Sequence, residues 1–320
     1  MSILMQPASW RNRQDPVRAA GWFGFYVFAA LVGGAVLGAL LVRYGLSQEE
    51  GFVSSLVENH GGSRITRRIQ TVVAVLLGPW MLKQIGWQGL SDLGWDNARR
   101  SAEAQRRDAY RGFGLGLIAM GGIFALAMIS GARVWETFSF GSWIGSILSG
   151  FLITGIGVGI LEETLTRGVL YRSMARCWGA WAGAVVSSLI FAYAHFLKAR
   201  PESFEAGVFA AVQSSFLDGL RYEGFGFLKM LNMFLFGLLL CRLVARRGDI
   251  WYAVGLHASA VGLIKVISRQ TSIADIPRNP WFGHSAKFDD GWLLTLILAV
   301  LIVAVDMVRS PSRESSRVHF

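Results

Sequence analysis

The chain of 320 residues is 53% hydrophobic and only 16% charged, whereas roughly a quarter of the residues in a soluble domain are charged. This composition excludes an ordinary soluble enzyme and favours a protein that lies mostly in lipid. The 31 Lys and Arg residues exceed the 21 Asp and Glu residues, which gives a net charge of +10. Because the basic residues lie between long apolar runs, we interpret this surplus as a set of topology signals.

Eight runs along the chain are apolar and about long enough to cross ~30 Å of hydrocarbon as helices that rise 1.5 Å per residue. They cover residues 20–42, 69–86, 112–131, 139–161, 180–197, 224–241, 250–267 and 291–308. The second run also contains Pro79 and Lys83. The sequence therefore predicts an all-α fold, a polytopic transmembrane helical bundle with about eight transmembrane helices.

The polar connections between these runs indicate the orientation of the chain. If the N-terminus is cytoplasmic, every cytoplasmic connection is basic, as the positive-inside rule expects. The residues concerned are Arg11, Arg13, Arg18, Lys83, Arg99, Arg100, Arg106, Arg107, Arg111, Arg172, Arg176, Arg242, Arg246, Arg247, Arg309, Arg313 and Arg317. We expect both termini in the cytoplasm and, because arginine far outnumbers lysine, a location in the inner (plasma) membrane of a bacterium.

Three parts are expected along the chain. Residues 1–138 hold N-terminal transmembrane helices, residues 139–268 a core that contains the candidate catalytic residues described below, and residues 269–320 an outside loop, the last transmembrane helix and a basic tail. Within the first part, the segment 87–111 mixes tryptophans with arginines and is predicted to lie on the cytoplasmic headgroup surface of the lipid bilayer. No recognised motif in this segment indicates a nucleic-acid partner.

The first candidate cluster for chemistry directly follows the apolar run 139–160. On a helix, Glu163 and Arg167 stand at i and i+4, the spacing at which a carboxylate and a guanidinium pair on one face. Glu162 is rotated by about 100° from Glu163 and stays free for another task. Burial without a cation would make Glu162 a stronger base, suited to general-base catalysis. The alternative is that both glutamates lie at the water interface.

Two histidines in apolar runs complete the set of candidates. His195 follows Phe191 by four residues, so the two rings share a helix face, although a histidine at the end of a span is more often an interfacial residue. His257 lies in the middle of its run, with Ser259 as the nearest polar neighbour, and needs a partner on another helix. Together with Glu162, the two imidazoles can surround a single water molecule. Asn232 is expected to hydrogen-bond across helices.

These residues, in this order, resemble the CAAX-protease and bacteriocin-processing (CPBP, or Abi) family of intramembrane proteases. The family signature is Glu-Glu-x-x-x-Arg, then Phe-x-x-x-His, then His-x-x-x-Asn on a later helix. The first two motifs are matched in full by Glu162, Glu163, Arg167, Phe191 and His195, and His257 begins the third. Val261 stands where the family has its asparagine. The resemblance covers about residues 139–262, and the segment 92–95 resembles a weaker family feature.

The resemblance implies a role for each matching position. Glu162 and His195 would activate water, His257 would stabilise the oxyanion, and Glu163, Arg167 and Phe191 would support them. The valine at position 261 leaves one oxyanion donor missing, and Ser259 or Asn232 are candidates to replace it. Removing one such donor typically costs ~10²- to 10³-fold in rate.

The function expected from this reasoning is an intramembrane endopeptidase that hydrolyses a membrane-associated protein or peptide. No cofactor is expected, because a water activated by glutamate needs no metal; the alternative is a zinc ion held by Glu162, His195 and His257. Two other functions stay open, a catalytically inactive scaffold of the same family and a transporter-like protein. Paired broken helices in symmetric halves would favour a transporter, and the sequence shows none.

Overall fold

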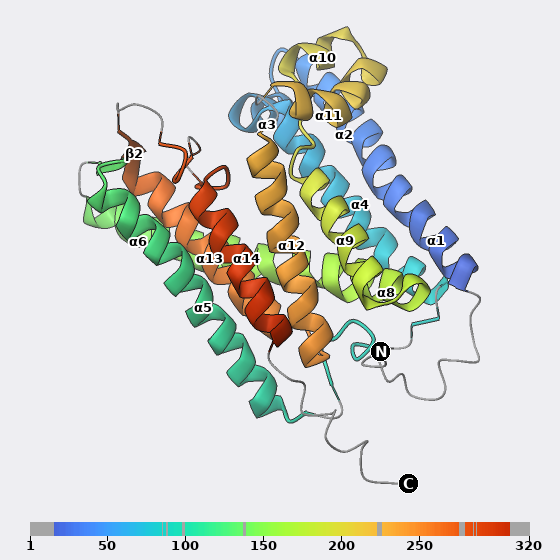
Figure 1. Ribbon diagram of the computed structural model, residues 1–320. Coiled ribbons are helices and arrows are strands. Elements are labelled where there is room, and N and C mark those ends of the chain that lie inside the picture. Colours follow the sequence, from blue (N-terminus) through green and yellow to red (C-terminus); the bar gives the residue numbers. More distant parts are fainter. Residues whose placement is uncertain are drawn as a thin grey trace, which may run out of the picture. The chain divides into compact units, whose positions relative to one another are not determined.

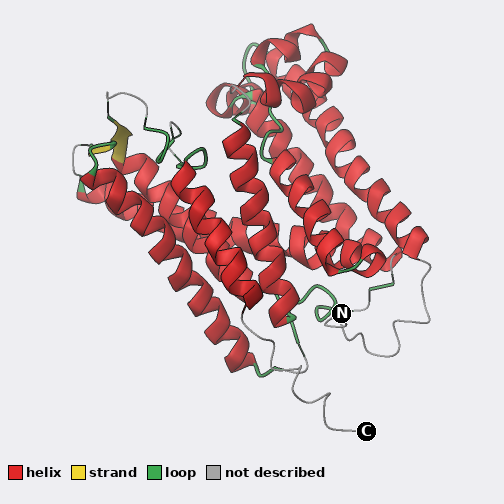
Figure 2. Cartoon of the chain, viewed as in Figure 1, coloured by secondary structure: helices red, strands yellow, loops and turns green. Residues whose placement is uncertain are grey.

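The computed structural model describes residues 16–307, except for residues 85, 88, 98–99, 137–138, 223–225, 275–278, 284 and 286. Helices dominate the described part of the chain (Figure 2). Five of them are long and apolar enough to cross a membrane: Gly24–Leu46, Ala102–Ile129, Phe140–Arg176, Phe227–Arg247 and Trp251–Gln270. The predicted all-α polytopic bundle is confirmed, and the chain is an integral membrane protein.

The predicted runs correspond to these helices unequally. Five of the eight fall largely within the five long helices, and the runs 180–197 and 291–308 correspond to the shorter apolar helices Ala180–Ala194 and Trp292–Met307. The run 69–86 lies in a helix with Pro79 in its interior that is not among these candidates. The number of eight spans therefore stays a prediction. So does the cytoplasmic placement of the termini, since Arg11, Arg13, Arg99, Arg309, Arg313 and Arg317 lie outside the described residues.

The chain forms two compact units, each made of segments distant in sequence. The flanking unit comprises the described residues of 6–88 and 192–226. Its elements are α1 (Pro16–Phe28), η1 (Ala29–Gly33), α2 (Gly34–Leu46), α3 (Phe52–His60), α4 (Gly62–Gln84), α10 (Pro201–Ala206) and α11 (Val208–Tyr222). Helix α2 packs closely against α4 because Gly34 and Gly38 face Gln70 and Thr66, where a Cβ atom would collide with the neighbouring backbone.

The core unit comprises the described residues of 89–191 and 227–320 (Figure 1). Its elements are α5 (Ala102–Ile129), β1 (Arg133–Trp135), α6 (Phe140–Ile147), η2 (Leu148–Val158), α7 (Gly159–Glu163), η3 (Thr164–Tyr171), α8 (Arg172–Trp178), most of α9 (Ala180–Ala194), α12 (Phe227–Arg247), α13 (Trp251–Gln270), β2 (Thr271–Ile273) and α14 (Trp292–Met307). The two short strands pair antiparallel, with Val134 opposite Ser272.

Helix α13 is the buried centre of the core unit and is packed on two sides through glycines. On one side, a Cβ atom at Gly112 or Gly116 of α5, or at Gly255 of α13, would collide with the backbone of the facing helix. On the other side, Gly155 of η2 lies against the carbonyl of Ala258. Small residues thus let the backbones approach without intervening side chains, as is common in membrane bundles.

Helix α5 begins ten residues before the predicted span 112–131. Its N-cap is Ser101, whose hydroxyl accepts a hydrogen bond of 3.2 Å from the backbone nitrogen of Ala104. Gln105 and Asp108 are buried on the inner face of the first turns. The segment 87–111 is therefore not one surface segment, because its last ten residues form the start of a helix packed on α13. Contact of its basic residues with headgroups stays a prediction.

The helix that carries the two glutamates changes its winding around them. The π-helical segments η2 and η3 enclose the short α7, which ends at Glu163. In η2, the hydroxyl of Thr154 donates to the carbonyl of Ser149, five residues earlier, at 3.0 Å. π-Helical turns are rare and occur frequently at functional sites.

Candidate active site

The buried glutamate and histidine of the core unit contact each other directly. The Nδ1 atom of His257, in the middle of α13, lies 2.7 Å from Oε1 of Glu163, at the end of α7. The histidine is 2% exposed and the glutamate is fully buried. Glu163 is thus the interhelical partner that a histidine at this depth requires. Sequence reasoning predicted the need for a partner but did not identify it.

Arg167 completes this pair as a buried cation. Its Nη1 donates to the same Oε1 atom of Glu163 at 3.0 Å, and its Nη2 donates to the carbonyl of Gly237 at 3.3 Å. The i, i+4 pair expected from the sequence is present, with both side chains fully buried. A carboxylate that accepts from both a guanidinium and an imidazole is held in one orientation, so it also holds the ring of His257.

Glu162 lies on the other side of the same imidazole. Its Oε2 atom is 3.7 Å from Nε2 of His257, and its side chain is 35% exposed, unlike that of Glu163. The distance exceeds that of a direct hydrogen bond and permits a short shift or a bridging atom. Of the two adjacent glutamates, one therefore anchors the histidine and the other is accessible next to it.

Two phenylalanines enclose the imidazole edge to face. The ring centroids of Phe191 and Phe236 lie 6.2 Å and 5.4 Å from that of His257, at interplanar angles of 85° and 88°. The guanidinium of Arg167 stacks on the Phe191 ring at 4.3 Å. Phe191 therefore contacts both Arg167 and His257, and its supporting role stays a prediction. The contact of Phe236 with His257 was not predicted, although the stretch from Phe236 to His257 resembles the sequence that leads to the last motif of the family.

Two buried polar atoms of the cluster have no hydrogen-bond partner among the described residues: Oε2 of Glu163 and Nε of Arg167. Buried polar groups are nearly always paired, so such atoms in one cluster call for a functional explanation. The cluster therefore retains hydrogen-bonding capacity next to an accessible carboxylate. Five other buried side-chain atoms of the described residues also lack a hydrogen-bond partner, so the adjacent carboxylate, and not the unpaired atoms alone, distinguishes this cluster.

His195 belongs to the flanking unit, just after the last residue of α9, and its side chain is exposed. Its backbone nitrogen donates to the carbonyl of Ala192 at 3.1 Å, which continues the helical turn of α9. Its partnership with Glu162 stays a prediction.

The two candidate replacements for the missing oxyanion donor are engaged elsewhere. The Asn232 amide donates to the carbonyls of Asp289 and Gly291, both at 3.1 Å, and accepts from the hydroxyl of Thr295 at 2.7 Å. The hydroxyl of Ser259 donates to the carbonyl of Leu256 at 3.1 Å and faces Gly116 of α5. Neither side chain is directed to Glu162, because each follows the face of its helix that packs on another neighbour.

A segment before α5 packs against the helix that carries the glutamates. The indole nitrogen of Trp95 donates to the hydroxyl of Thr164 at 3.0 Å, and the backbone carbonyl of Trp95 accepts from the indole of Trp251 at 2.8 Å. The carbonyl of Gly94, whose φ of +77° favours glycine, accepts from the backbone nitrogen of Ile250 at 3.0 Å. The segment 92–95 thus joins η3 to the start of α13.

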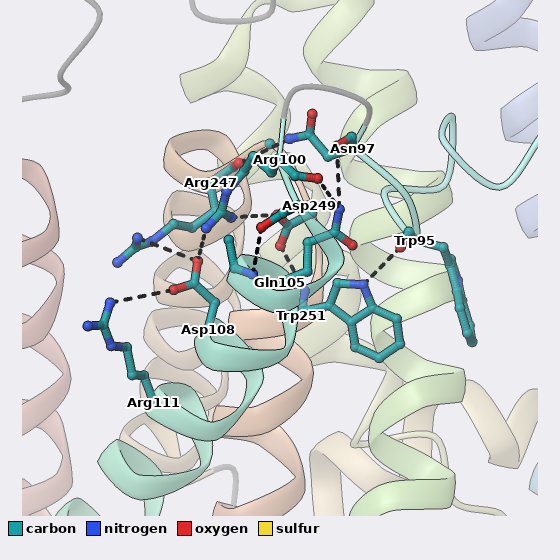
Figure 3. Close-up of polar contacts among 12 residues, drawn as sticks. Trp95, Asn97, Arg100, Gln105, Asp108, Arg111, Arg247, Asp249 and Trp251 are labelled. Atoms are coloured by element: carbon teal, nitrogen blue, oxygen red, sulfur yellow. Dashed lines mark hydrogen bonds and ion pairs between the residues drawn. The ribbon is translucent and has the colours of Figure 1, made fainter.

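A second polar cluster lies at the N-terminal end of α13 (Figure 3). Arg100 donates to Asp108 and to Asp249, both at 2.6 Å, and Arg247 lies 3.4 Å from Asp108. Asp249 also accepts from the backbone nitrogen of Trp251 at 3.2 Å, which caps α13. Burial raises the pKa of the Asp249 carboxyl above its ordinary value. The sequence gave little signal of this network, because its members come from three distant segments.

The part of the chain that the structure describes contains no preformed set of metal ligands. No three His, Cys, Asp or Glu side chains are grouped there as ligands of one ion. In the candidate site, Oε1 of Glu163 is already shared by Arg167 and His257. The absence of a cofactor, and the alternative of zinc, both stay predictions.

The chain was compared with models of known protein families, with curated proteins and with solved structures. Residues 144–263 match the family model described as type II CAAX prenyl endopeptidase, Rce1-like. No curated protein and no solved structure matches the chain. The match spans every position of the motifs, from Glu162 to His257. Residues 144–263 therefore match an Rce1-like domain, which confirms the resemblance of this part of the chain to the CAAX-protease and bacteriocin-processing family.

Proposed function

We propose that this protein hydrolyses peptide bonds of a membrane-associated protein or peptide with a water activated by Glu162 and His195. The observation that carries the proposal is the Glu162–His257–Glu163 arrangement: a buried carboxylate fixes the imidazole at 2.7 Å, and an accessible carboxylate lies 3.7 Å from its other nitrogen. The Rce1-like match over the same residues supports a peptidase.

In the proposed reaction, the Glu162 carboxylate accepts a proton from water while the water oxygen bonds to the scissile carbonyl carbon. His195 orients the water. The carbonyl π electrons move to oxygen, and the resulting oxyanion accepts a hydrogen bond from Nε2–H of His257. When the tetrahedral intermediate collapses, the C–N bond breaks and the departing amine takes the proton from Glu162. The products are a carboxylic acid and an amine, which become a carboxylate and an ammonium ion when the acid passes its remaining water proton to the amine.

The contact between Glu163 and His257 gives the oxyanion donor its direction. When both ring nitrogens carry protons, Nδ1–H donates to Glu163 and Nε2–H stays free for the oxyanion. Arg167 balances the charge of Glu163, so that this carboxylate does not itself compete as a base. A donor held by packing and a charge-assisted hydrogen bond needs no reorganisation during the reaction.

The proposed substrate class rests on the helices that carry these residues, which are long and apolar enough to cross a membrane. A carboxylate and an imidazole on membrane-spanning helices can reach only a peptide that itself enters or lies on the bilayer. The matching family is named for prenylated substrates, and a bacterial chain would instead act on an unprenylated membrane peptide. We propose the unprenylated class.

The test uses the full chain in lipid nanodiscs with internally quenched peptides, one set S-farnesylated and one set carrying a transmembrane anchor. We expect cleavage of anchored peptides, and a loss of ~10²- to 10⁴-fold in Glu162→Gln. Glu58→Gln, an exposed glutamate of the flanking unit, is the matched control and should cleave normally. Equal cleavage by wild type and Glu162→Gln would disprove the mechanism.

The proposed absence of a metal is tested on the same preparation. Incubation with 1,10-phenanthroline followed by desalting should leave the cleavage rate unchanged, and the metal content should not correlate with activity. A rate that falls on chelation and returns on adding zinc would contradict this proposal.

One observation favours a second function, an inactive scaffold of the same family. Val261 replaces the family asparagine, and the polar side chains of Ser259 and Asn232 are engaged elsewhere. A scaffold would retain its cellular phenotype in a Glu162→Gln, His195→Gln, His257→Gln triple variant, whereas a peptidase would lose it.

A further inference from the structure

The outer face of the first turns of α5 carries a basic patch. Residues spaced i, i+3, i+4, i+7 and i+8 share one helix face, and here they are Glu103, Arg106, Arg107, Tyr110 and Arg111. These five line a surface hollow of about 560 Å³. The opposite face, with Gln105 and Asp108, is buried. The patch is therefore not used in packing α5 against α13.

The cations of this patch are poorly compensated. Arg106 and Arg107 are exposed and form no ion pair or hydrogen bond among the described residues. Arg111 lies 3.9 Å from Asp108, but its side chain is 56% exposed (Figure 3). An anion bound from outside would compensate these charges.

The same helix face continues as an apolar stripe. Ile118 and Ile129, seven and eighteen residues after Arg111, are 74% and 83% exposed. Seven residues make about two helical turns and eighteen make about five. Both isoleucines therefore lie on the same face as Arg111, further toward the C-terminal end of α5. The first is ~10 Å from Arg111 along the axis. Tyr110, 75% exposed, is a residue type enriched at the membrane interface. Basic groups above an exposed apolar stripe complement one ligand shape, a charged headgroup with an acyl chain.

We propose that this face of α5 binds an anionic phospholipid of the bilayer, with its phosphate on Arg106, Arg107 and Arg111 and an acyl chain along Ile118. Three arginines against the single Glu103 favour an anionic over a zwitterionic headgroup. The site is independent of the proposed peptidase activity, since none of its residues belongs to the Glu162–His257 cluster.

The test counts lipids bound to the delipidated full chain by native mass spectrometry during titration with phosphatidylglycerol, phosphatidylcholine or glycerol phosphate. One arginine near an anionic headgroup is worth about fivefold in affinity. We therefore expect Arg106→Gln/Arg107→Gln to weaken phosphatidylglycerol binding roughly 25-fold. Arg64→Gln/Arg68→Gln, an exposed pair on α4 with the same loss of charge, should leave it within twofold.

Three results would overturn the proposal: equal losses in the two double variants, equal affinity for phosphatidylcholine and phosphatidylglycerol, or binding of glycerol phosphate as tight as that of the lipid. If Arg106→Gln/Arg107→Gln does not fold, Glu103→Gln provides an independent measurement. Removing this carboxylate should tighten phosphatidylglycerol binding about fivefold, and an unchanged affinity would contradict the site.

Discussion

Two polar clusters of the core unit both hold α13, but they differ in how completely they satisfy their own charges. In the network at the N-terminal end of the helix, Arg100 bridges Asp108 and Asp249 at 2.6 Å each, and Asp249 also caps α13. In the cluster at mid-helix, Oε2 of Glu163 and Nε of Arg167 have no partner among the described residues.

The difference separates two uses of buried charge. A network whose carboxylates are paired with arginines and a helix N-terminus has little capacity left for a ligand, so its role is to fix the start of α13. A cluster with unpaired atoms and an accessible Glu162 keeps that capacity, at a cost in stability. We therefore expect substitutions to affect stability in both clusters and chemistry only in the second.

The largest effect on stability is expected for Glu163→Gln. The substitution leaves Arg167 as a buried cation without a counter-charge, which costs about 3–5 kcal/mol. Asp108→Asn should cost less, because Arg100 keeps Asp249 and is partly exposed. Chemical denaturation in detergent, followed by tryptophan fluorescence, measures both. If both variants lost the same free energy of unfolding, the two clusters would depend equally on their charges, and the distinction between them would fail.

A gain of activity is expected for Val261→Asn, which restores the family's oxyanion donor four residues after His257. One donor is worth ~10²–10³-fold where it is fully aligned, so we expect a rise in kcat of at least about tenfold, with little change in KM. Val261→Leu, of similar size and without a donor, is the control. A rise in both variants would attribute the effect to packing.

The smallest effect is expected for Asp249→Asn at neutral pH, about 1 kcal/mol, because the amide oxygen can still accept from Trp251. Burial raises the pKa of Asp249 from its ordinary value of 3.8, so the folded state holds this proton more tightly than the unfolded state. The stability that Asp249 contributes therefore falls as pH rises above about 4.

Thermal unfolding of wild type and Asp249→Asn between pH 4 and 8 tests this sign. The advantage of the wild type over the variant should be largest at the acid end. If the stability difference between wild type and variant grew with pH, the ion pair with Arg100 would outweigh the cost of burying Asp249. The charges of the network would then stabilise the fold.

The sequence predicted the helical class well, because long apolar runs have one stable solution in lipid. It placed the start of α5 too late, since Arg106, Arg107 and Arg111 interrupt the apolar run on the outer face only. The inner face continues through Asp108 and Gln105, whose burial depends on Arg100 and on backbone carbonyls from other segments. A hydropathy pattern records composition along the chain and not the partners that make a buried polar residue tolerable.

For the candidate site, the motif spacing predicted the pair of Glu163 and Arg167, and the position of His257 in the middle of an apolar run predicted its need for a partner on another helix. It did not predict which glutamate contacts the histidine. Glu162 and Glu163 are adjacent in sequence, and their directions depend on the winding of α7 between two π-helical segments. The engagement of Asn232 by Thr295 was also out of reach, because it requires knowing that α12 and α14 are neighbours.

The glycine contacts of α13 would also restrict how the proposed substrate can approach. Where Gly112 meets α13 the two backbones are in contact, and at Gly116 the small side chain of Ser259 fills the space between the helices. If Glu162 is the base of the proposed peptidase, its peptide would not enter between α5 and α13, because this seam is closed by close helix packing. The substrate would then have to approach α13 from a side other than the one packed on α5.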